Sequence, residues 1–340
     1  MDEIIIKVQG LRKTFKKLRK KEGFLSSFRS LLIRDFERIH SVKGIDMEIR
    51  KGEIRGIIGP NGAGKSTTIK MLSGILFPTE GTVDVMGFTP WLDRERYVRH
   101  LGVLFGQKSQ LWWDLPPIDT FLLIKEMYRI PEEDFKARLN RFKSMLQIER
   151  IIYQPVRTLS LGERMKCELV CAVLHEPPLV FLDEPTIGLD IVSKETIREF
   201  IKQMSRDKQT TFIVTTHDLA DIENLCDRVT IINKGTIVFD DSMERLSSYF
   251  SNRKVVEIKF TQPVEEKLLD SYKVISSGAM SVSIEIDTGE FDLKKVIFEI
   301  LDRFPVLDVN IMNIPIEEVI KHIYSHEEKV VGYGEKVGVG

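Results

Sequence analysis

The feature that most constrains this chain is the eight-residue run G-P-N-G-A-G-K-S at positions 59–66. It follows the Ile-rich, strand-like run 54–58 and precedes a stretch with helical periodicity. The spacing matches the pattern G-x-x-x-x-G-K-[ST], in which glycines allow successive backbone N–H groups to face phosphate oxygens. The pattern predicts a buried strand, a phosphate-binding loop and a helix, in that order. A glycine-rich turn without a ligand is a much weaker alternative, because strand, loop, lysine and serine all agree.

The side chains of this loop suit a nucleoside triphosphate with a metal ion. The Lys65 ammonium supplies positive charge to the β- and γ-phosphates, and the Ser66 hydroxyl can ligate Mg²⁺. The helix that begins near Ser66 adds its positive N-terminal dipole. We therefore predict a triphosphate and Mg²⁺ as cofactors, and the binding residues expected here are Gly59, Pro60, Asn61, Gly62, Ala63, Gly64, Lys65, Ser66 and Thr67.

Two adjacent carboxylates, Asp183 and Glu184, follow the apolar run 179–182. Parallel α/β sheets bind their ligands at the carboxyl ends of the strands, where these side chains are expected to lie. Two like charges in a buried region are costly unless a cation or a substrate stabilises them. We expect Asp183 to hold Mg²⁺, directly or through water, and Glu184 to orient and deprotonate the attacking water. A helix-capping turn before Pro185 is the alternative interpretation.

Further motifs resemble those of one family. The run L-S-L-G-E at 159–163 resembles the signature motif of ABC ATPases. Gln107, the run 187–190 and His217 match the family's other motifs in the same order along the chain. The resemblance covers residues 4–240. It implies that the nucleotide is ATP and that the chain hydrolyses it.

By this resemblance, the signature residues complete the nucleotide site of a second subunit. Ser160 can cap a helix, and Gly162 lets the backbone approach a γ-phosphate. Leu161 replaces the usual glycine and Glu163 the usual glutamine, whereas Asp190 of the D-loop matches the family. The resemblance implies a head-to-tail pair of ATPase subunits with two ATP molecules between them, the second subunit being a copy or a close relative.

The resemblance also implies roles in hydrolysis. Gln107 would touch Mg²⁺ or water and sense a membrane partner, and His217 would contact the γ-phosphate. His217 follows the apolar run 211–215, which places it at the same sheet edge as Asp183 and favours this role over that of a core histidine. Phe15 lies near the position where the family stacks a ring on adenine, with a core phenylalanine as the alternative. The catalytic residues expected are Glu184, His217, Gln107 and Lys65, and the metal ligands are Ser66, Gln107 and Asp183.

Short apolar strands alternate with helical stretches as far as about residue 240, which predicts an α/β core with a mostly parallel sheet. The clearest strands are 4–8, 54–58, 180–182, 212–215 and 229–232. Turn signals near 51–52, 78–81 and 234–235 predict additional antiparallel hairpins. The fold class expected is α/β, a P-loop NTPase core of the ABC ATPase type with an antiparallel β subdomain and a helical insert.

The domain organisation expected is an ATPase domain and a smaller second domain. Residues 1–240 form the ATPase domain, in which about 108–160 form a helical subdomain with the signature motif. From residue 241 the phosphate-site features cease, and 241–326 read as a small α+β domain. Its expected strands are 255–260, 281–286 and 306–311, and its expected helices are 293–301 and 316–324. The Gly- and Lys-rich tail 327–340 is expected to fray.

Residues 16–40 form a basic insert, with eight Lys or Arg against three acidic residues. Its apolar side chains fall on one face of a predicted helix, namely Phe24, Phe28, Leu31, Leu32 and Phe36. Such a helix can lie on anionic lipid, where each basic residue near the surface adds about 1 kcal/mol. Packing of the apolar stripe against protein is the favoured alternative.

The composition of the chain limits the kinds of partner it can bind. A formal net charge of −1 argues against a general nucleic-acid binder. No apolar run approaches the ~18–20 residues needed to cross a bilayer. We therefore expect that the chain does not itself span a membrane. The resemblance to ABC ATPases implies a peripheral position on the cytoplasmic side of the cell membrane, in contact with transmembrane permease subunits. The three cysteines, Cys167, Cys171 and Cys226, fit small core residues better than a metal or redox site.

Trp112 and Trp113 follow Gln107 on a polar stretch, and in ABC ATPases this region faces the membrane subunit. Docking by at least one tryptophan and burial in the helical insert are both open. The run 105–113 and the small second domain resemble those of ABC-2-type exporter ATPases, so an exporter subunit is the leading hypothesis. The alternatives are a soluble ABC ATPase of DNA repair or translation and a P-loop kinase. The short distance from the phosphate-binding loop to the signature motif disfavours a DNA-repair ATPase, and the single ATPase cassette disfavours a translation ATPase. The presence of the signature motif and the D-loop disfavours a P-loop kinase.

Overall fold

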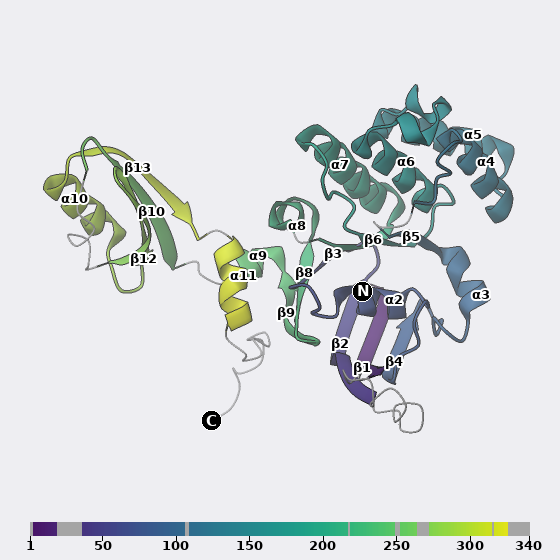
Figure 1. Ribbon diagram of the computed structural model, residues 1–340, viewed down its shortest axis with the longest axis horizontal. Helices are drawn as coiled ribbons and strands as arrows, with labels where there is room; N and C mark the ends of the chain where they lie inside the picture. Colours follow the sequence, from purple (N-terminus) through teal and green to yellow (C-terminus); the bar gives the residue numbers. More distant parts are fainter. Residues whose placement is uncertain are drawn as a thin grey trace, which may run out of the picture. The chain divides into compact units, whose positions relative to one another are not determined.

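The computed structural model describes residues 3–18, 36–105, 109–216, 218–248, 252–263, 272–314 and 316–325. The chain divides into two compact units, and the first runs as far as Asp241 while the second spans Ser242–Glu327. In the first unit, helices and two sheets surround the phosphate-binding loop. In the second, a four-stranded sheet packs on a helix (Figure 1).

A six-stranded sheet forms the centre of the first unit, in the order β5-β6-β7-β3-β8-β9. Its strands are β3 (Ile54–Ile58), β5 (Leu101–Phe105), β6 (Leu179–Asp183), β7 (Thr211–Thr215), β8 (Arg228–Asn233) and β9 (Thr236–Ser242). The pairs β5–β6, β6–β7, β7–β3 and β3–β8 are parallel. Every residue of β3 and β7 is buried, because helices or a second sheet cover both faces. The expected parallel α/β core is confirmed.

A second, antiparallel sheet has the order β2-β1-β4, with β1 at Ile4–Leu18, β2 at Phe36–Arg50 and β4 at Glu80–Val85. Its buried side chains pack with those of α2 and one face of the six-stranded sheet in one hydrophobic core. The antiparallel subdomain predicted from the sequence is therefore present. Of the predicted hairpin turns, Lys234-Gly235 joins the neighbouring strands β8 and β9, with positive φ at both residues. The turn at 51–52 instead joins strands of different sheets, and 78–81 leads into β4 without a preceding strand.

The two ends of the basic insert are strands rather than parts of a helix. Leu18 of β1 pairs with Phe36 of β2, and cross-strand pairs continue from there to the core. The helical assignment of Phe36 is thus wrong. Its backbone pairs with β1 in a sheet, and the helical spacing of apolar side chains gives no information about such a pairing. The other four apolar positions of the predicted stripe lie outside the described residues.

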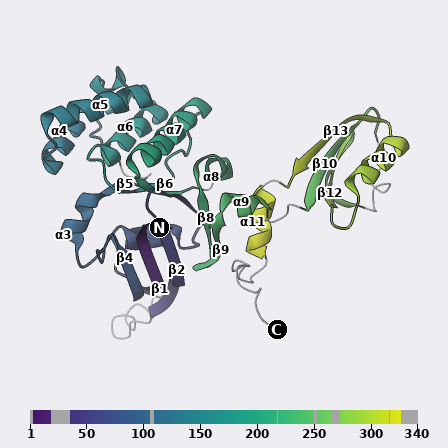
Figure 2. The ribbon, with the colours of Figure 1, turned by 180° about the vertical axis from the view of Figure 1, so that it is seen from behind.

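Helices cover both faces of the six-stranded sheet. They are α2 (Lys65–Leu72), α3 (Arg94–Tyr97), α4 (Pro117–Tyr128), α5 (Glu132–Leu146), α6 (Leu161–Val173), α7 (Ile191–Lys208) and α8 (Leu219–Leu225). Figures 1 and 2 show α4 to α7 together on one side of this sheet, with α2 and the antiparallel sheet on the other. Pro117 is the first residue of α4, and Pro131 is the N-cap residue immediately before α5. The three cysteines are buried and unpaired, and burial raises the pKa of Cys167 to about 12.

The second unit contains an antiparallel sheet in the order β11-β12-β10-β13. Its elements are α9 (Met243–Ser248), β10 (Arg253–Phe260), β11 (Lys273–Gly278), β12 (Ser281–Asp287), α10 (Leu293–Arg303), β13 (Val306–Asn313) and α11 (Ile316–Ser325). Alternate residues of β10 and β12 pack on Val296 and Ile300 of α10. Of these strands, β11 was not predicted, since most of its side chains are exposed and carry no apolar alternation.

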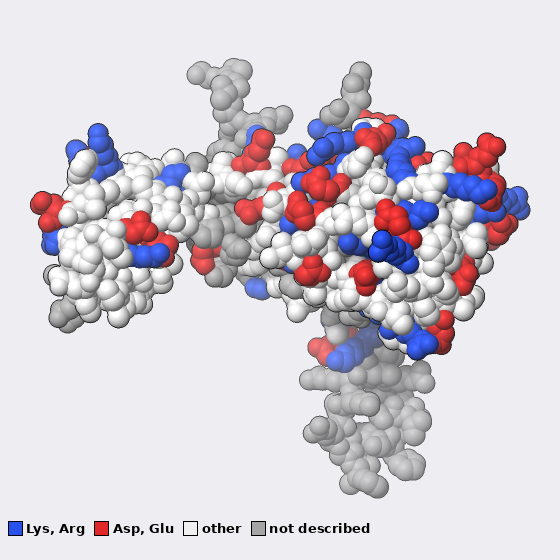
Figure 3. Space-filling view, turned by 90° about the horizontal axis from the view of Figure 1, so that it is seen from above, with Lys and Arg blue, Asp and Glu red and all other residues white. Residues whose placement is uncertain are grey.

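No helix among the described residues is both long and apolar enough to cross a bilayer. On the face shown in Figure 3, the described Lys and Arg residues are mixed with Asp and Glu and form no extended basic patch.

Candidate active site

The phosphate-binding loop connects β3 to α2 and depends on glycine at two crowded positions (Figure 1). Gly64, the N-cap of α2, has φ 112°, and a Cβ there would lie 2.6 Å from the Ser41 carbonyl oxygen. A Cβ on Gly59 would collide with the Ile232 carbonyl oxygen. Only glycine fits where the loop passes so close to neighbouring backbone. The loop is thus wedged between β2 and β8.

A cavity of about 510 Å³ opens in front of this loop. It brings together the loop and the two acidic residues that the sequence predicted, and it is lined by Ser41, Asn61, Gly62, Ala63, Gly64, Lys65, Ser66, Thr67, Asp183, Glu184 and Ile187. Lys65 Nζ donates to the carbonyl oxygens of Gly59 at 2.6 Å and Pro60 at 3.3 Å. Burial lowers the pKa of Lys65, and the charges of Glu184 and Asp183 oppose that shift. A cation facing two carboxylates suits a polyphosphate with a metal ion.

The carboxylates are positioned by pairing between β6 and β7. Asp183 lies beside Thr215 in the parallel register, and the Thr215 hydroxyl donates to Asp183 Oδ1. Glu184 N–H donates to the Thr215 carbonyl oxygen at 2.9 Å. Glu184 has φ 55°, in the left-handed region that a residue with a side chain seldom adopts. This backbone directs the chain out of the sheet just where both carboxylates reach the cavity.

Sequence reasoning missed Ser41, which lines the cavity, and Thr215, which holds the Asp183 carboxylate. The Ser41 hydroxyl is 2.9 Å from that of Thr67, and its carbonyl oxygen lies against Gly64. Ser41 comes from β2, a strand whose pairing the sequence pattern did not predict. Thr215 carried a usable signal, because it is a polar residue at the end of a wholly buried strand.

Phe15 lies apart from this cavity, and two further predicted residues are not described. Phe15 is an exposed residue of β1, with Lys13 Nζ 5.2 Å from its ring centroid, so the core alternative is wrong. It is not among the residues that line the cavity. Gln107 and His217 lie outside the described residues, although the neighbours of His217, Thr216 and Asp218, are described.

The predicted signature residues form the start of α6, away from the cavity. Ser160 is the N-cap, and its hydroxyl accepts from Glu163 N–H while the Glu163 carboxylate accepts from Ser160 N–H at 2.8 Å. This reciprocal capping box satisfies two backbone donors at the helix end. A Cβ on Gly162 would lie 3.0 Å from Ser193 Cβ and 3.4 Å from Asp190 Oδ2. The signature turn therefore packs on the start of α7, where Asp190 is the N-cap.

The residues that line the cavity fit a magnesium–nucleotide complex. Mg²⁺ prefers oxygen ligands and is commonly held by one or two carboxylates together with substrate phosphates. Ser66 and Asp183 both line the cavity, and their hydroxyl and carboxylate groups supply such oxygens. Within the described parts of the chain, no cluster of three or more His, Cys, Asp or Glu could hold a metal on its own.

The chain is similar to known proteins in sequence. The family model described as ABC transporter matches residues 42–187. The ABC transporter ATP-binding protein NatA of Bacillus subtilis is 31% identical over 208 residues, covering 61% of this chain and 84% of that protein. The ATP-binding protein MJ1023 of Methanocaldococcus jannaschii is 32% identical over 231 residues, with coverages of 66% and 82%. The linearmycin resistance ATP-binding protein LnrL of Bacillus subtilis is 27% identical over 280 residues, with coverages of 82% and 89%.

Solved structures agree. The dimeric ATP-binding cassette MJ0796, bound to ADP and Pi in a post-hydrolysis state, matches with a TM-score of 0.58 at 25% identity, over 70% of this chain and 98% of that one. CbiO1 from Clostridium perfringens, part of the transporter complex cbiONQ, matches with a TM-score of 0.59 at 25% identity, over 72% and 91%. The phosphate loop, the acidic strand and these relatives together establish the family: the chain belongs to the ATP-binding proteins of ABC transporters, which bind and hydrolyse ATP.

Proposed function

We propose that this chain is the ATP-hydrolysing subunit of an ABC-2-type exporter, and that it works as a head-to-tail pair with two ATP molecules between the subunits. The observation that carries this proposal is the position of the signature turn. Ser160 and Gly162 begin α6 beside Asp190, but none of them lines the cavity around Lys65. A signature that does not reach its own phosphate loop is free to meet the loop of a second subunit.

Exposed apolar side chains support this pairing. Ile191 and Val192, in the first turn of α7, are 84% and 70% exposed. Leu161 of the signature and Ile187 of the cavity rim are also exposed. Large apolar side chains gathered around a functional site are typical of a protein interface. The second subunit, a copy or a close relative, would cover them.

Hydrolysis in this site relies on charge stabilisation and an aligned water. Lys65 would bind the β- and γ-phosphates, Ser66 and Asp183 would hold Mg²⁺, and Glu184 would accept the proton of the attacking water. When bound, Mg²⁺ neutralises charge on the phosphate oxygens. We assign Gln107 and His217 the roles that the family implies, water or metal contact and γ-phosphate contact, and Phe15 the adenine contact. Ser160, Leu161, Gly162, Glu163 and Asp190 would contact the nucleotide bound by the other subunit.

A docking site for the transmembrane permease is proposed beside the segment that follows Gln107. A cavity of about 380 Å³ lies there, lined by Val103, Phe105, Ser109, Gln110, Tyr128 and His175 among others. Trp112 and Trp113 are 58% and 56% exposed, so burial in the helical insert does not explain them. Leu122, Leu123 and Met127 of α4 are exposed as well. Apolar and aromatic anchors of this kind suit a permease contact on the cytoplasmic face of the membrane.

Export is favoured over import by the relatives. One is named for linearmycin resistance, and outward transport is a direct means of resistance to a compound. Another, ABC transporter A family member 1 of Dictyostelium discoideum, is 30% identical over 239 residues, which cover 70% of this chain and 27% of that longer protein.

The domain boundaries proposed from the sequence, 1–240 for the ATPase domain and 241–326 for the second domain, are kept in this proposal.

The test is Mg-ATP hydrolysis and dimer formation by wild type and by Glu184→Gln. Loss of a general base costs about 10²–10⁴ in rate. The variant is expected to bind ATP, to hydrolyse it at that reduced rate and to accumulate as a dimer in light scattering. Glu199→Gln, at an exposed position of α7, is the matched control and should resemble wild type. Hydrolysis by Glu184→Gln at the wild-type rate would refute the role of Glu184, and an inactive variant that stays monomeric with ATP would refute self-pairing.

A further inference from the structure

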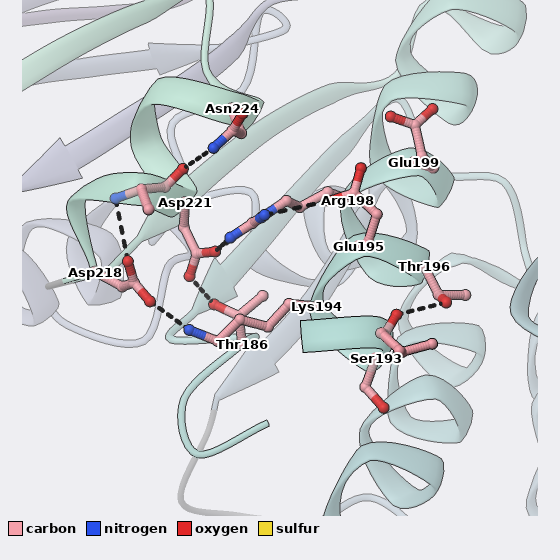
Figure 4. A network of polar contacts seen from close by, with 12 residues as sticks. Thr186, Ser193, Lys194, Glu195, Thr196, Arg198, Glu199, Asp218, Asp221 and Asn224 are labelled. Atoms are coloured by element: carbon pink, nitrogen blue, oxygen red, sulfur yellow. Dashed lines mark hydrogen bonds and ion pairs between the residues drawn. The ribbon is translucent and has the colours of Figure 1, made fainter. Parts of the chain in front are cut away.

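A buried carboxylate outside the cavity joins three segments of the site. Asp221, in the first turn of α8, is 2% exposed. Its Oδ2 accepts from the Thr186 hydroxyl, and its Oδ1 accepts from Arg198 Nε at 2.9 Å and from Arg198 Nη2. Thr186 belongs to the turn after Glu184, and Arg198 to α7. Figure 4 shows the three side chains converging, with Asp221 between the other two.

A second clamp lies one turn away along both helices. Lys194 of α7 forms an ion pair with Asp218, the N-cap of α8. Asp218 Oδ1 also accepts from Ala220 N–H at 3.1 Å, and Asp218 N–H donates to the Thr216 hydroxyl at 2.9 Å. Two contacts one turn apart fix the register between α7 and α8 (Figure 4). The Thr186 hydroxyl is thereby held against a rigid pair of helices.

The network does not contact the nucleotide site directly. The described residues that line the cavity include Glu184 and Ile187, on either side of Thr186, but not Thr186, Asp221 or Arg198. Thr186 is itself buried. A buried ion pair contributes little to stability compared with apolar residues of the same volume, so its presence here calls for another reason.

The turn that carries Glu184 needs such support. With φ 55°, Glu184 has a backbone conformation that costs energy for a residue with a side chain and persists only when its neighbours enforce it. On the β7 side, Glu184 N–H donates to the Thr215 carbonyl oxygen. On the other side, the Thr186 hydroxyl joins the turn to Asp221. Within the turn, Ile187 N–H donates to the Glu184 carbonyl oxygen at 3.4 Å, a long contact. If the contact between Thr186 and Asp221 is removed, the turn loses its link to α8 and the Glu184 carboxylate can shift.

We propose that Asp221 is a positioning residue for ATP hydrolysis: held by Arg198, it fixes Thr186 and through it the turn that places Glu184 against the attacking water. The proposal rests on the role of Glu184 as the base. It requires that the loss of this contact lowers kcat and leaves nucleotide binding intact, because the phosphate loop 59–67 belongs to other elements.

The chain offers a matched control. Among residues that do not line the cavity, the Thr230 hydroxyl donates to Asp240 Oδ1 at 2.9 Å, and Arg55 pairs with the same carboxylate. Thr230 and Thr186 are both buried, and each donates to a carboxylate that also binds an arginine. Thr186→Val and Thr230→Val therefore each remove one hydroxyl from a Thr–Asp–Arg contact of the same kind. The first contact belongs to the proposed mechanism and the second does not.

The experiment compares kcat and KM for Mg-ATP in the full chain for wild type, Thr186→Val, Thr186→Ser, Asp221→Asn and Thr230→Val, with the ATP-binding fraction measured by nucleotide titration. Rates are expressed per nucleotide-binding site, so partial unfolding does not imitate the effect. Because a shift of about 1 Å can cost on the order of 10²-fold in rate, we expect a roughly tenfold or greater loss of kcat for Thr186→Val and Asp221→Asn. KM should stay within about twofold, and Thr186→Ser, which keeps the hydroxyl, should recover most of the rate.

Three results would overturn the proposal. One is an unchanged kcat per binding site in Thr186→Val, and another is an equal loss in Thr230→Val, which would mark a general effect of destabilisation. The third is a loss confined to KM. Glu184→Gln separates this from a failure of the proposed mechanism: if that variant hydrolyses ATP normally, the role of Glu184 fails whatever the Thr186 variants do.

Discussion

Gly162 at the start of α6 lies against Ser193 in the first turn of α7, so closely that a side chain at position 162 would collide with the Ser193 hydroxyl. The same hydroxyl donates to Asp190 Oδ2 at 2.7 Å. The signature turn and the D-loop residue Asp190 are therefore joined inside one subunit. Any shift of one is transmitted to the other, which couples the two parts proposed to face the second subunit's nucleotide.

This contact predicts the effect of Gly162→Ala. The added methyl must displace Ser193 or the start of α6, so we expect at least a tenfold loss of ATP hydrolysis, on the scale of a misplaced catalytic element. Adding Ser193→Gly removes both atoms that crowd position 162 and should restore part of the rate. Steady-state ATPase assays of the single and double variants check this. A double variant no faster than Gly162→Ala alone would speak against the steric explanation.

Trp112 and Trp113 are predicted to anchor the permease. Truncation of a central aromatic anchor typically costs about 2 kcal/mol or more, which is roughly thirtyfold or more in affinity. We expect the double Trp→Ala variant to recover about tenfold less membrane subunit in a pull-down from native membranes, with soluble ATPase activity unchanged. Tyr153→Ala, another exposed aromatic of the helical subdomain, is the control. Equal recovery by both variants would remove the tryptophans from the docking site.

His175 is predicted to make stability fall in mild acid. Its Nε2 donates to the Leu101 carbonyl oxygen at 2.9 Å, its buried Nδ1 has no partner in the described part of the chain, and burial lowers the pKa of His175 to about 4. The unfolded chain takes up this proton near pH 6.5, whereas the folded chain resists protonation until about pH 4. The folded state therefore loses stability as the pH falls between these values.

The loss amounts to about 2 kcal/mol between pH 7 and pH 5 for a shift of this size. The measurement is the urea dependence of unfolding at both pH values for wild type and His175→Gln. The variant should show a smaller decrease between the two, and both should change alike above pH 7. Identical pH dependence in the two proteins would show that His175 does not titrate as described.

Replacing residues 19–35 by Asn-Gly should separate membrane binding from catalysis. The last described pair of the β1–β2 ladder is Leu18–Phe36, and Asn-Gly can close such a two-stranded ladder. The removed segment carries five basic and two acidic residues, so binding to vesicles that contain phosphatidylserine should weaken while ATPase activity stays within about twofold. Co-sedimentation with anionic and with neutral vesicles is the measurement. Unaltered binding to the anionic vesicles would exclude this segment as the membrane contact.

The sequence was most informative where one physical signal dominated. The run 54–58, three isoleucines together with Arg55 and Gly56, predicted β3 to the residue, because a strand buried on both faces shows no regular alternation of polar and apolar residues. Lys65, Asp183 and Glu184 were expected to meet because parallel strands end at one sheet edge, and they line one cavity. These predictions depended on local pattern and on a general rule of topology.

What the sequence did not predict depends on partners distant along the chain. The Lys-rich end of β1 lacks apolar alternation and is a strand because Phe36–His40 pairs with it. Ser41 reaches the loop because β2 passes Gly64, and Thr186 meets Asp221 across 35 positions. Neither hydrophobic periodicity nor a sequence motif predicts such contacts, since a serine, threonine or aspartate is found in many structural environments.

The ladder formed by β1 and β2 has a mechanical consequence. Beyond the pair Lys13–Val42, five more cross-strand pairs carry it to Leu18–Phe36, about 17 Å at the usual rise of a strand. At its inner end, β2 contains Ser41, which touches both Gly64 and Thr67 of the phosphate loop. The paired strands β1 and β2 therefore connect Leu18 and Phe36 to the phosphate-binding loop. A displacement of the pair Leu18–Phe36 would therefore pass along β2 to Ser41, and from there to the backbone of the phosphate-binding loop.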